Sequence, residues 1–520
     1  MNHLLTVADA VAAHARLQPH KIGARDSRRA LTFAEWHDRA SRLANGLLSL
    51  GLVKGDRVAL LAHNCVEWME LYVALARAGL VAVPINFRLT ALEIAYIVSH
   101  CEARAFIVQG DLCDRANFIR AELTIPAHAY ISIDALPASG WQDYEALIES
   151  AAADSAMHAV RPGDPCALMY TSGTTGRPKG AIRSHEGNTL IALATALELG
   201  FTRHDTALLV MPMCHANSLY FSHTFVHLGA TCIIDDRKSF DPEALLATLA
   251  REKVTFTSLV PTHYIMMLGL PQATKAKYDV AAVEKLMISS APARKDTKLA
   301  ILEHFRNGRL YELYGSTEAG WVTLLRPEEQ IERLGSVGRE WAGSGAIRLL
   351  DPQGREVPDG QVGELHSRTP YVFDGYWKNA EKTAECFRGD WCSVGDMARR
   401  DACGYIILVD RKSNMIISGG ENIYPSEVES ILGAHAAVKD VAVIGVPHDK
   451  WGESVLAVVV VHAGQHASAT ELLDWCRHRI AGFKRPQTVV FIADSEMPRT
   501  ATGKILHRVL RDRMAPQAPH

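Results

Sequence analysis

Apolar runs of strand length alternate with amphipathic helical segments along most of this chain, and this alternation constrains the fold more than any other feature. Thr32 and Glu35 form a capping box at the start of the first such helix, and Gly51 ends it. The expected strands of the large N-terminal part lie at 58–62, 80–83, 105–108, 206–210, 231–234 and 255–259. Strands and helices that alternate at this spacing predict an α/β fold with parallel sheets and right-handed crossovers.

The C-terminal part of the chain follows a different order of elements. A helix is expected from Pro425, because proline suits the first turn of a helix, and Ser468 with Glu471 caps a second one. Strands are expected at 441–446, 455–461 and 488–493. We therefore expect a small α+β domain at 413–520, attached to a large domain of layered sheets and helices at 1–412.

The composition is that of an ordinary globular protein and excludes several classes of function. Hydrophobic residues make up 48% of the 520 residues and charged residues 22%, which excludes a disordered chain, a coiled coil and a collagen-like rod. Lysine and arginine number 55 against 58 aspartate and glutamate, a net charge of −3, so nucleic acid is not an expected partner. The 23 histidines show no paired spacing typical of a metal site.

Cysteine usage and the N-terminal region predict a cytoplasmic protein. None of the ten cysteines forms a Cys-x-x-Cys pair, so a zinc ribbon and a thioredoxin-like site are excluded and reduced, buried thiols are expected. Asp9, His14 and Arg16 interrupt the only apolar stretch near the N-terminus, which argues against a secretion signal. No apolar run reaches the length of a transmembrane helix.

The most informative segment is a run of glycines and hydroxyl residues after an expected strand at 166–170. It reads Tyr170-Thr171-Ser172-Gly173-Thr174-Thr175-Gly176-Arg177-Pro178-Lys179-Gly180. Glycines let the backbone bend so that consecutive N–H groups face one anion, and the hydroxyls with the Lys179 ammonium add further donors. The run therefore predicts a loop that binds a polyphosphate. It is not a Walker loop, because no Gly-Lys-Ser or Gly-Lys-Thr ends it.

Five more short segments follow this loop along the chain. They are Tyr314-Gly315-Ser316-Thr317-Glu318, Gly395-Asp396, Asp410-Arg411, Ser418-Gly419-Gly420-Glu421-Asn422 and Pro498-Arg499-Thr500-Ala501-Thr502-Gly503-Lys504-Ile505. In this order, and together with the loop at 170–180, they make the chain resemble the adenylate-forming superfamily of acyl-CoA synthetases, luciferases and peptide-synthetase adenylation domains. The resemblance covers nearly the whole chain.

The resemblance implies a nucleotide site and assigns its catalytic residues. Thr317 would contact the AMP phosphate, Glu318 would help to hold Mg²⁺, and Asp396 would accept both ribose hydroxyls. Arg411 would also contact the ribose. Lys504 would be the mobile catalytic lysine. The cofactor-binding set that the resemblance implies is Thr171, Ser172, Gly173, Thr174, Thr175, Lys179, Ser290, Ala291, Pro292, Tyr314, Gly315, Ser316, Asp396, Arg411, Gly419 and Gly420.

The resemblance also implies a second half-reaction that uses a different surface. The small domain at 413–520 would be a mobile lid that rotates about a hinge, withdraws Lys504 and presents Gly419 and Gly420 beside a channel for the pantetheine arm of CoA. The family usually carries Asp or Lys where this chain has Ser413, so the identity of the pivot is open. The expected cofactors are ATP and Mg²⁺, with CoA as a cosubstrate.

Segments that line the acyl pocket in the resembling family match 212–220, 260–264, 289–293 and the start of the stretch 315–321 of this chain. No Asp, Glu, Lys or Arg occurs at 211–230 or at 256–270. Since an unpaired buried charge is costly, we expect an acid that is uncharged beyond its carboxylate.

Two side chains of these segments bear on the choice of acid. His215 matches the family's gating residue near the substrate carboxylate and is included among the catalytic residues. Trp321 is bulky and would shorten or flatten the pocket, and Ser289-Ser290 replaces the commoner Gly-Gly. The interpretation favours a medium- or long-chain fatty acid, with a cinnamate-like or benzoate-like aromatic acid as the alternative.

The chemistry that the resemblance implies follows from the poor reactivity of a carboxylate. Direct attack by a thiol would expel oxide, whereas transfer of AMP from ATP creates a good leaving group and releases pyrophosphate. Mg²⁺ at Glu318, with Lys179 and Lys504, would offset the charge of the two anionic reactants. We therefore predict an ATP-dependent ligase that forms acyl-CoA, AMP and pyrophosphate by way of an acyl-adenylate.

Other functions stay open at this point. An adenylation module that loads a carrier protein is one, although this chain stops soon after Lys504 without a carrier domain. A luciferase-like oxygenase and an inactive nucleotide-binding regulator are others, and the intact Lys179, Glu318 and Lys504 argue against the regulator. The expected partners are a small-molecule carboxylic acid, ATP and CoA, while peripheral membrane contact and a homodimer are left open.

Overall fold

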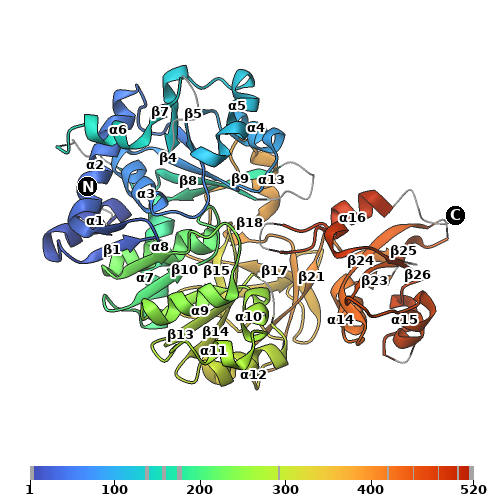
Figure 1. Ribbon diagram of the computed structural model, residues 1–520. Coiled ribbons are helices and arrows are strands. Elements are labelled where there is room, and N and C mark those ends of the chain that lie inside the picture. Colours follow the sequence, from blue (N-terminus) through green and yellow to red (C-terminus); the bar gives the residue numbers. More distant parts are fainter. Residues whose placement is uncertain are drawn as a thin grey trace. The chain divides into compact units, whose positions relative to one another are not determined.

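The described residues of the chain form two compact units (Figure 1). The computed structural model describes residues 5–134, 140–154, 160–171, 178–290, 293–418, 421–448, 450–477, 479–500 and 503–514. The first unit comprises Met1–Ala346 and Ser367–Cys392, and the second comprises Ile347–His366 and Ser393–His520. The boundary expected between residues 412 and 413 falls within the second unit and stays a prediction.

One sheet of the first unit has seven strands within the described residues, in the order β7-β6-β5-β3-β4-β8-β9. The strands are β3 Arg57–Leu61, β4 Val81–Ile85, β5 Ala103–Gln109, β6 Tyr130–Ile133, β7 Gln142–Asp143, β8 Pro165–Thr171 and β9 Lys179–Ser184. β3 pairs in parallel with both β4 and β5, whereas β8 and β9 are antiparallel. The strand order therefore reverses beside β3, and open α/β sheets bind ligands at the carboxyl edge near such a reversal.

The other large sheet has eight strands in the described part of the chain, in the order β15-β14-β13-β12-β10-β11-β1-β2. The strands are β1 Ile22–Arg25, β2 Ala30–Thr32, β10 Thr206–Leu209, β11 Thr231–Ile234, β12 Phe256–Leu259, β13 Lys285–Ser289, β14 Arg309–Ser316 and β15 Gly320–Leu325. The strands from β11 to β14 pair in parallel, and β15 returns antiparallel to β14. The carboxyl ends of β13 and β14 therefore lie at the same edge of this sheet.

Helices connect the strands of both sheets and form much of the core between them (Figure 1). They are α1 Val7–Leu17, α2 Phe33–Ser49, α3 Glu67–Ala78, α4 Ala91–His100, α5 Cys113–Ile119, α6 Tyr144–Ser150, α7 His185–Leu199, α8 Ala216–Leu228, α9 Pro242–Arg251, α10 Pro261–Leu268, α11 Gln272–Lys275, α12 Lys295–His304 and α13 Ala380–Cys386, the last followed by the short strands β18 Phe387–Arg388 and β19 Trp391–Cys392. The capping box of Thr32 and Glu35 is present at α2. At the end of α3, Gly79 adopts φ 68°, a left-handed conformation that glycine adopts without strain.

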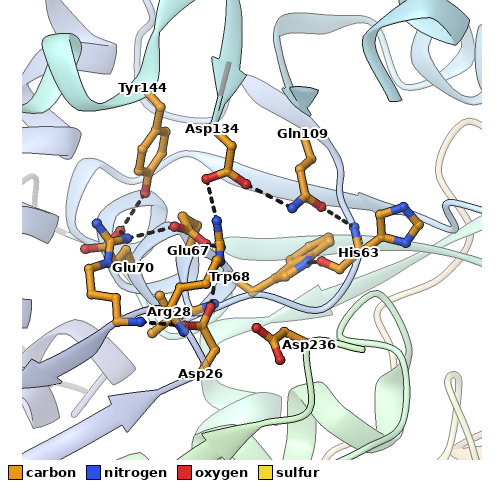
Figure 2. Close-up of polar contacts among 12 residues, drawn as sticks. Asp26, Arg28, His63, Glu67, Trp68, Glu70, Gln109, Asp134, Tyr144 and Asp236 are labelled. Carbon is orange, nitrogen blue, oxygen red and sulfur yellow. Dashed lines mark hydrogen bonds and ion pairs between the residues drawn. The ribbon is translucent and has the colours of Figure 1, made fainter. Parts of the chain in front are cut away.

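A network of buried ions joins the turn between β1 and β2 to the start of α3 (Figure 2). The Asp26 carboxylate accepts the backbone N–H of Val66 at 3.0 Å, and so supplies a cap that α3 lacks locally. The Glu67 carboxylate lies 3.0 Å from Nη2 of Arg28 and 2.9 Å from Nη2 of Arg29. Burial raises the pKa of Glu67, and the two guanidinium groups oppose that shift. This turn is therefore held against α3 by charge as well as by packing.

The same network fills the edge of the seven-stranded sheet beside the reversal point. Gln109, at the end of β5, accepts the backbone N–H of His63 at 3.0 Å and donates to Asp134 at 3.1 Å. Arg28 donates to the other carboxylate oxygen of Asp134 at 2.5 Å (Figure 2). Protein side chains therefore occupy this part of the carboxyl edge.

The second unit contains two antiparallel arrangements of strands. β16 Ile347–Leu350, β17 Val362–Ser367, β20 Asp396–Arg400 and β21 Ile406–Arg411 form the first, and β22 Ile416–Ser418, β23 Glu421–Ile423, β24 Val438–His448, β25 Gly452–Val461 and β26 Thr488–Phe491 form the second, in which β26 is parallel to β25. Its helices are α14 Pro425–Gly433, α15 Ala469–Cys476 and α16 His507–Met514.

Alternate residues of β24 and β25 contribute to two separate apolar clusters. Val443 belongs to a cluster with residues of α14 and α15, whereas its neighbour Ile444 belongs to a cluster with residues of α16. Because successive side chains of a strand point to opposite faces, helices cover both faces of this hairpin, which explains its continuous apolar sequence.

The prediction of fold class is confirmed. The structure has a large part built of layered sheets and helices and a smaller, β-rich C-terminal part. The capping boxes expected at Thr90 and Ser468 are present, and all ten cysteines are free thiols. None of the described helices combines the length and the hydropathy needed to cross a membrane.

Candidate active site

A tight hairpin between β14 and β15 carries Thr317 and Glu318 at its tip. A side chain at position 315 would begin 2.2 Å from the carbonyl oxygen of Gly320, so the two strands approach too closely for any residue but glycine. Gly320 itself has φ 70°, and Ser316 Oγ accepts the backbone N–H of Ala319 at 2.9 Å. The hairpin therefore holds the Glu318 carboxylate at a fixed place near the carboxyl edge of the sheet.

The Glu318 carboxylate connects three segments that are far apart in the sequence. Thr171 Oγ1, at the end of β8, donates to Glu318 Oε1 at 3.1 Å, and the Tyr376 hydroxyl donates to the same oxygen at 2.8 Å. The Lys179 ammonium lies 4.2 Å from the centre of the Tyr376 ring, which is the distance of a cation–π contact. Burial and the neighbouring Glu318 carboxylate raise the pKa of Tyr376, so its hydroxyl remains a donor. Thr171, Lys179 and Glu318, all predicted from the sequence, thus lie together.

Sequence reasoning missed two residues of this arrangement, Tyr376 and Arg183. Arg183 is fully buried, and its Nη1 lies 3.4 Å from the carbonyl oxygens of both Thr317 and Glu318. Its guanidinium also lies 5.2 Å from the centre of the Tyr220 ring. A lone arginine in the short strand after the glycine-rich loop was the available signal for Arg183. Tyr376 follows Gly375, which adopts φ 132°, but this conformation is visible only in the structure.

The donor set near Glu318 fits a magnesium ion that is held mainly by substrate phosphates. Both hydrogen bonds that other described residues make to the Glu318 carboxylate reach Oε1, so Oε2 is the oxygen suited to ligate a cation. No group of three or more His, Cys, Asp or Glu side chains in the described residues could form a protein-only metal cage. Mg²⁺ commonly takes one or two carboxylates and completes its shell with phosphate oxygens and water.

The residues expected near the substrate carboxylate lie where α8 begins. His215 Nε2 is buried and without a partner among the described residues, and burial, with a smaller effect of Arg88, lowers the pKa of His215 to about 4. His215 is therefore neutral at pH 7. Two residues later, Asn217 donates to Ser258 Oγ at 3.1 Å and to Ser289 Oγ at 3.0 Å, which ties α8 to the ends of β12 and β13.

Ser290 adopts a left-handed backbone conformation, with φ 69°. A residue with a side chain adopts this conformation only at a cost of about 1 kcal/mol, whereas glycine does not. This conformation explains why the resembling family commonly has glycine where this chain has Ser290.

Aromatic rings fill the space between α8 and β15. Trp321 packs edge-on against Tyr220, with ring centres 5.1 Å apart, and lies 5.5 Å from the ring of Phe221. The Trp321 indole N–H donates to Thr195 Oγ1 at 3.0 Å, and the residue is only 6% exposed. Trp321 is therefore locked in one position.

Asp396 and Arg411 lie opposite each other on β20 and β21 of the second unit. They are paired in the strand register, and Arg411 Nε lies 2.6 Å from Asp396 Oδ1. The neighbouring Asp410 carboxylate accepts the backbone N–H of Ser426 at 2.9 Å, in the first turn of α14. The two predicted ribose-binding residues are thus brought together in a segment that is tied to α14.

Lys504 lies in a short hairpin that leads into α16. Its backbone N–H donates to Thr500 Oγ1 at 3.1 Å, and its carbonyl accepts the backbone N–H of Thr500 at 2.7 Å. Lys504 is exposed over much of its surface, but protein atoms surround its ammonium. This burial of the ammonium, and secondly the charge of Arg411, lower the pKa of Lys504, while the charges of Asp396 and Asp410 oppose the shift. Lys504 therefore lies near the Asp396–Arg411 pair within the second unit.

The remaining predicted site residues can be placed only in part. Tyr314, Gly315 and Ser316 end β14 beside Thr317. Ser172, Gly173, Thr174, Thr175, Ala291, Pro292, Gly419 and Gly420 lie outside the described residues.

Comparison with known proteins identifies the family of this chain. The family model described as AMP-binding enzyme matches residues 11–377, and the model described as AMP-binding enzyme C-terminal domain matches residues 427–504. The chain is 37% identical to a feruloyl-CoA synthase of Amycolatopsis over 96% of this chain and 97% of that protein. It is 33% identical to a long-chain-fatty-acid–CoA ligase of Mycobacterium tuberculosis over 97% of each.

A solved structure with a bound acyl-AMP shows the same fold. An anthranilate–CoA ligase in complex with anthranoyl-AMP superimposes with a TM-score of 0.89, at 27% identity, over 99% of this chain and 98% of that one. The chain therefore belongs to the AMP-binding enzyme family. Within it, this protein is an AMP-forming acid–CoA ligase that works through an acyl-adenylate and uses ATP, Mg²⁺ and CoA. The predicted family, enzyme class and cofactors are confirmed.

Proposed function

We propose that this enzyme activates an aromatic carboxylic acid, of the cinnamate-like or benzoate-like kind, to its CoA thioester. The observation that carries the proposal is the cluster of Tyr220, Phe221 and Trp321, whose rings fill the space between α8 and β15. In this proposal Trp321 ends the acyl pocket, and a pocket that is short and has aromatic walls would suit a flat ring better than a long flexible chain. The similarity to a feruloyl-CoA synthase and to an anthranilate–CoA ligase supports the same choice.

The first unit binds the triphosphate in this proposal. The loop that starts at Thr171 and the Lys179 ammonium bind the phosphates, and Thr317 contacts the phosphate that stays with the nucleotide. Mg²⁺, when bound, supplies positive charge to the phosphate oxygens. Glu318 offers Oε2 to the cation, because Thr171 and Tyr376 hold Oε1 and thereby fix the rotamer of the carboxylate.

The second unit supplies the ribose contacts and the catalytic lysine. Asp396 exchanges part of its contact with Arg411 for the two ribose hydroxyls, since a carboxylate offers two acceptors that match a vicinal diol. Lys504 donates to the oxygen that gains negative charge as the carboxylate attacks phosphorus. In the second half-reaction the CoA thiol attacks the acyl carbonyl and AMP leaves.

His215 orients the acid in this scheme. Its Nε2 is buried and has no partner among the described residues, so it is available to a hydrogen-bonding group of the substrate. Because its pKa is lowered to about 4, His215 is neutral at pH 7 and offers one N–H without adding charge to the pocket.

A medium- or long-chain fatty acid is the second candidate, and the sequence interpretation favoured it. The absence of charged residues at 211–230 and 256–270 suits an alkyl chain as well as a ring. The similarity to a long-chain-fatty-acid–CoA ligase, at 33% identity, supports it. The two candidates differ in the length of acyl group that the pocket accepts.

A pyrophosphate-release screen over aromatic, fatty and dicarboxylic acids, with and without CoA, separates the candidates. The proposal expects the highest kcat/KM with an aromatic acid. The proposal also expects Trp321→Ala to favour long-chain acids. The kcat/KM for a long-chain acid, divided by that for an aromatic acid, should rise by about 10-fold or more, because each further methylene group that the enlarged pocket accommodates contributes about that factor. Trp341→Ala is the matched control, since Trp341 is equally buried at 6% exposure. An unshifted ratio in Trp321→Ala, or a wild type that prefers long chains, would refute the aromatic proposal.

A further inference from the structure

The Lys504 hairpin is anchored to the body of the second unit at both of its ends. Before the lysine, the Arg499 guanidinium contacts the carboxylates of Asp440 and Asp494. After the lysine, His507 Nε2 lies 2.6 Å from Glu429 Oε1. Between the anchors, a backbone pairing of Arg499 with Ile505 closes the hairpin. Two charged contacts therefore flank Lys504. Of the two, the His507–Glu429 contact is the one that involves a group that titrates near neutral pH.

The His507–Glu429 contact reaches both a helix and a strand. Glu429 is on α14, and its Oε1 also accepts the backbone N–H of Val443, on β24, at 2.8 Å. The two side chains are largely buried, with 14% of His507 and 21% of Glu429 exposed, so solvent screens the ion pair less than it would at a surface. The contact thus ties the end of the lysine hairpin to two elements of the unit.

Protonated His507 needs its acidic partner. His507 is the first residue of α16, where the helix dipole disfavours a positive charge. The charged groups around it are Glu429 on α14, Asp410 on β21 and Lys504 on its own hairpin. Burial, the largest single effect, and the charge of Lys504 lower the pKa of His507. The hydrogen bond to Glu429 and the charges of Glu429 and Asp410 together outweigh them, so the pKa is raised.

Building on the proposed role of Lys504 in adenylation, we propose that His507 is a positioning residue, which holds the lysine hairpin in place through its ion pair with Glu429. The same helix α14 receives the Asp410 carboxylate at its first turn, next to Arg411. α14 therefore links the end of the lysine hairpin to the segment that carries the ribose-binding pair. Loss of the proton from His507 weakens this link and leaves Arg499 as the remaining charged anchor of the hairpin.

The pH dependence follows from the direction of the shift. Because the folded protein raises the pKa of His507, the ion pair is complete below the ordinary value of about 6.5 and is lost as pH rises through the higher folded value. Adenylation should fall across that window. A second fall at higher pH, from Lys504 itself, should remain in any variant that keeps the lysine.

The test compares His507→Arg with His507→Gln in pyrophosphate–ATP exchange between about pH 6 and 9. His507→Gln should already be about 10-fold slower at the acid end, which is the effect of losing one charge-assisted hydrogen bond. His507→Arg keeps a positive charge, so it should restore the rate and remove the first fall with pH. His435→Gln is the control, because its Nε2 lies 3.4 Å from Glu471 in the same unit but outside the lysine hairpin.

Conversion of preformed acyl-adenylate with CoA distinguishes positioning from a general loss of structure. That half-reaction should be unchanged in His507→Gln, because Lys504 does not act in it. Equal losses in both half-reactions, or a His507→Gln profile identical to the wild type, would overturn the inference. Absence of pyrophosphate–ATP exchange in the wild type with every acid tested would instead overturn the proposed function.

Discussion

Tyr376→Phe tests whether the Tyr376 hydroxyl positions the Glu318 carboxylate for binding Mg²⁺. The substitution removes the 2.8 Å hydrogen bond to Glu318 Oε1 and the weak contact that the Cys386 thiol donates to the hydroxyl at 3.8 Å, and it keeps the ring that the Lys179 ammonium approaches. A hydrogen bond to a charged acceptor contributes about 1.5–3 kcal/mol, and Glu318 is only 7% exposed, so water replaces it poorly. Thr171 keeps its own bond to the same oxygen, so we use the lower end of that range, which corresponds to about 10-fold.

The expected result is a rise of about 10-fold in the Mg²⁺ concentration that half-saturates pyrophosphate release, with little change in the KM of the acid. Pyrophosphate release measured against Mg²⁺ at fixed, saturating ATP checks it. Tyr371→Phe is the matched control. The Tyr371 hydroxyl donates to the backbone oxygen of Trp321 at 2.9 Å, so this substitution removes a comparable buried hydrogen bond that does not involve Glu318. If both variants show the same Mg²⁺ dependence, or neither differs from the wild type, the assignment of Tyr376 and of Glu318 Oε2 is wrong.

Three further substitutions test the remaining roles. Lys504→Ala should slow adenylation by about 100–1000-fold and leave thioester formation from preformed adenylate intact. As pH rises, the wild type should lose adenylation before the ordinary lysine pKa is reached, because the pKa of Lys504 is lowered and its ammonium loses the proton early. Half-reaction assays over a pH series check both. Asp396→Ala should mainly raise the KM for ATP, since its ribose contact exists before and during the reaction, and an unaltered ATP dependence would remove it from the site. Glu70→Ala should lower the free energy of unfolding by about 3 kcal/mol, because it removes the buried carboxylate that Arg29 and Arg39 share and leaves Arg39 with the half-exposed Glu145 alone. Denaturant titration checks it, with Asp38→Ala, which breaks the more exposed Asp38–Arg42 pair, as the control.

Much of the fold could be predicted because its signals are local. The capping box at Thr32 and the left-handed Gly79 mark helix ends by the chemistry of single residues. The strands β1 and β2 carry no such signal, since each is four residues or fewer. β1 takes its place by pairing with β11, which lies far along the chain, and β2 pairs in turn with β1. Pairings of this kind depend on long-range contacts, so local propensity does not reveal them.

The candidate site divides in the same way. Glu318, Lys179 and Lys504 lie in segments whose residue order is characteristic, so sequence reasoning found them. Tyr376 and Arg183 act through one hydrogen bond and through buried carbonyl contacts, and neither belongs to a motif that the sequence analysis identified. Their roles depend on which residues the fold brings beside the hairpin, and that information is spread over the whole chain.

The turn between β1 and β2 has a practical consequence for anyone who shortens this protein. A fragment that began at Phe33 would lose Asp26, and with it the carboxylate that caps α3. It would also leave Glu67 without both of its arginine counterions. The segment from Ile22 to Thr32 is thus an integral part of the fold, and an expression tag should be placed upstream of this segment and should not replace it.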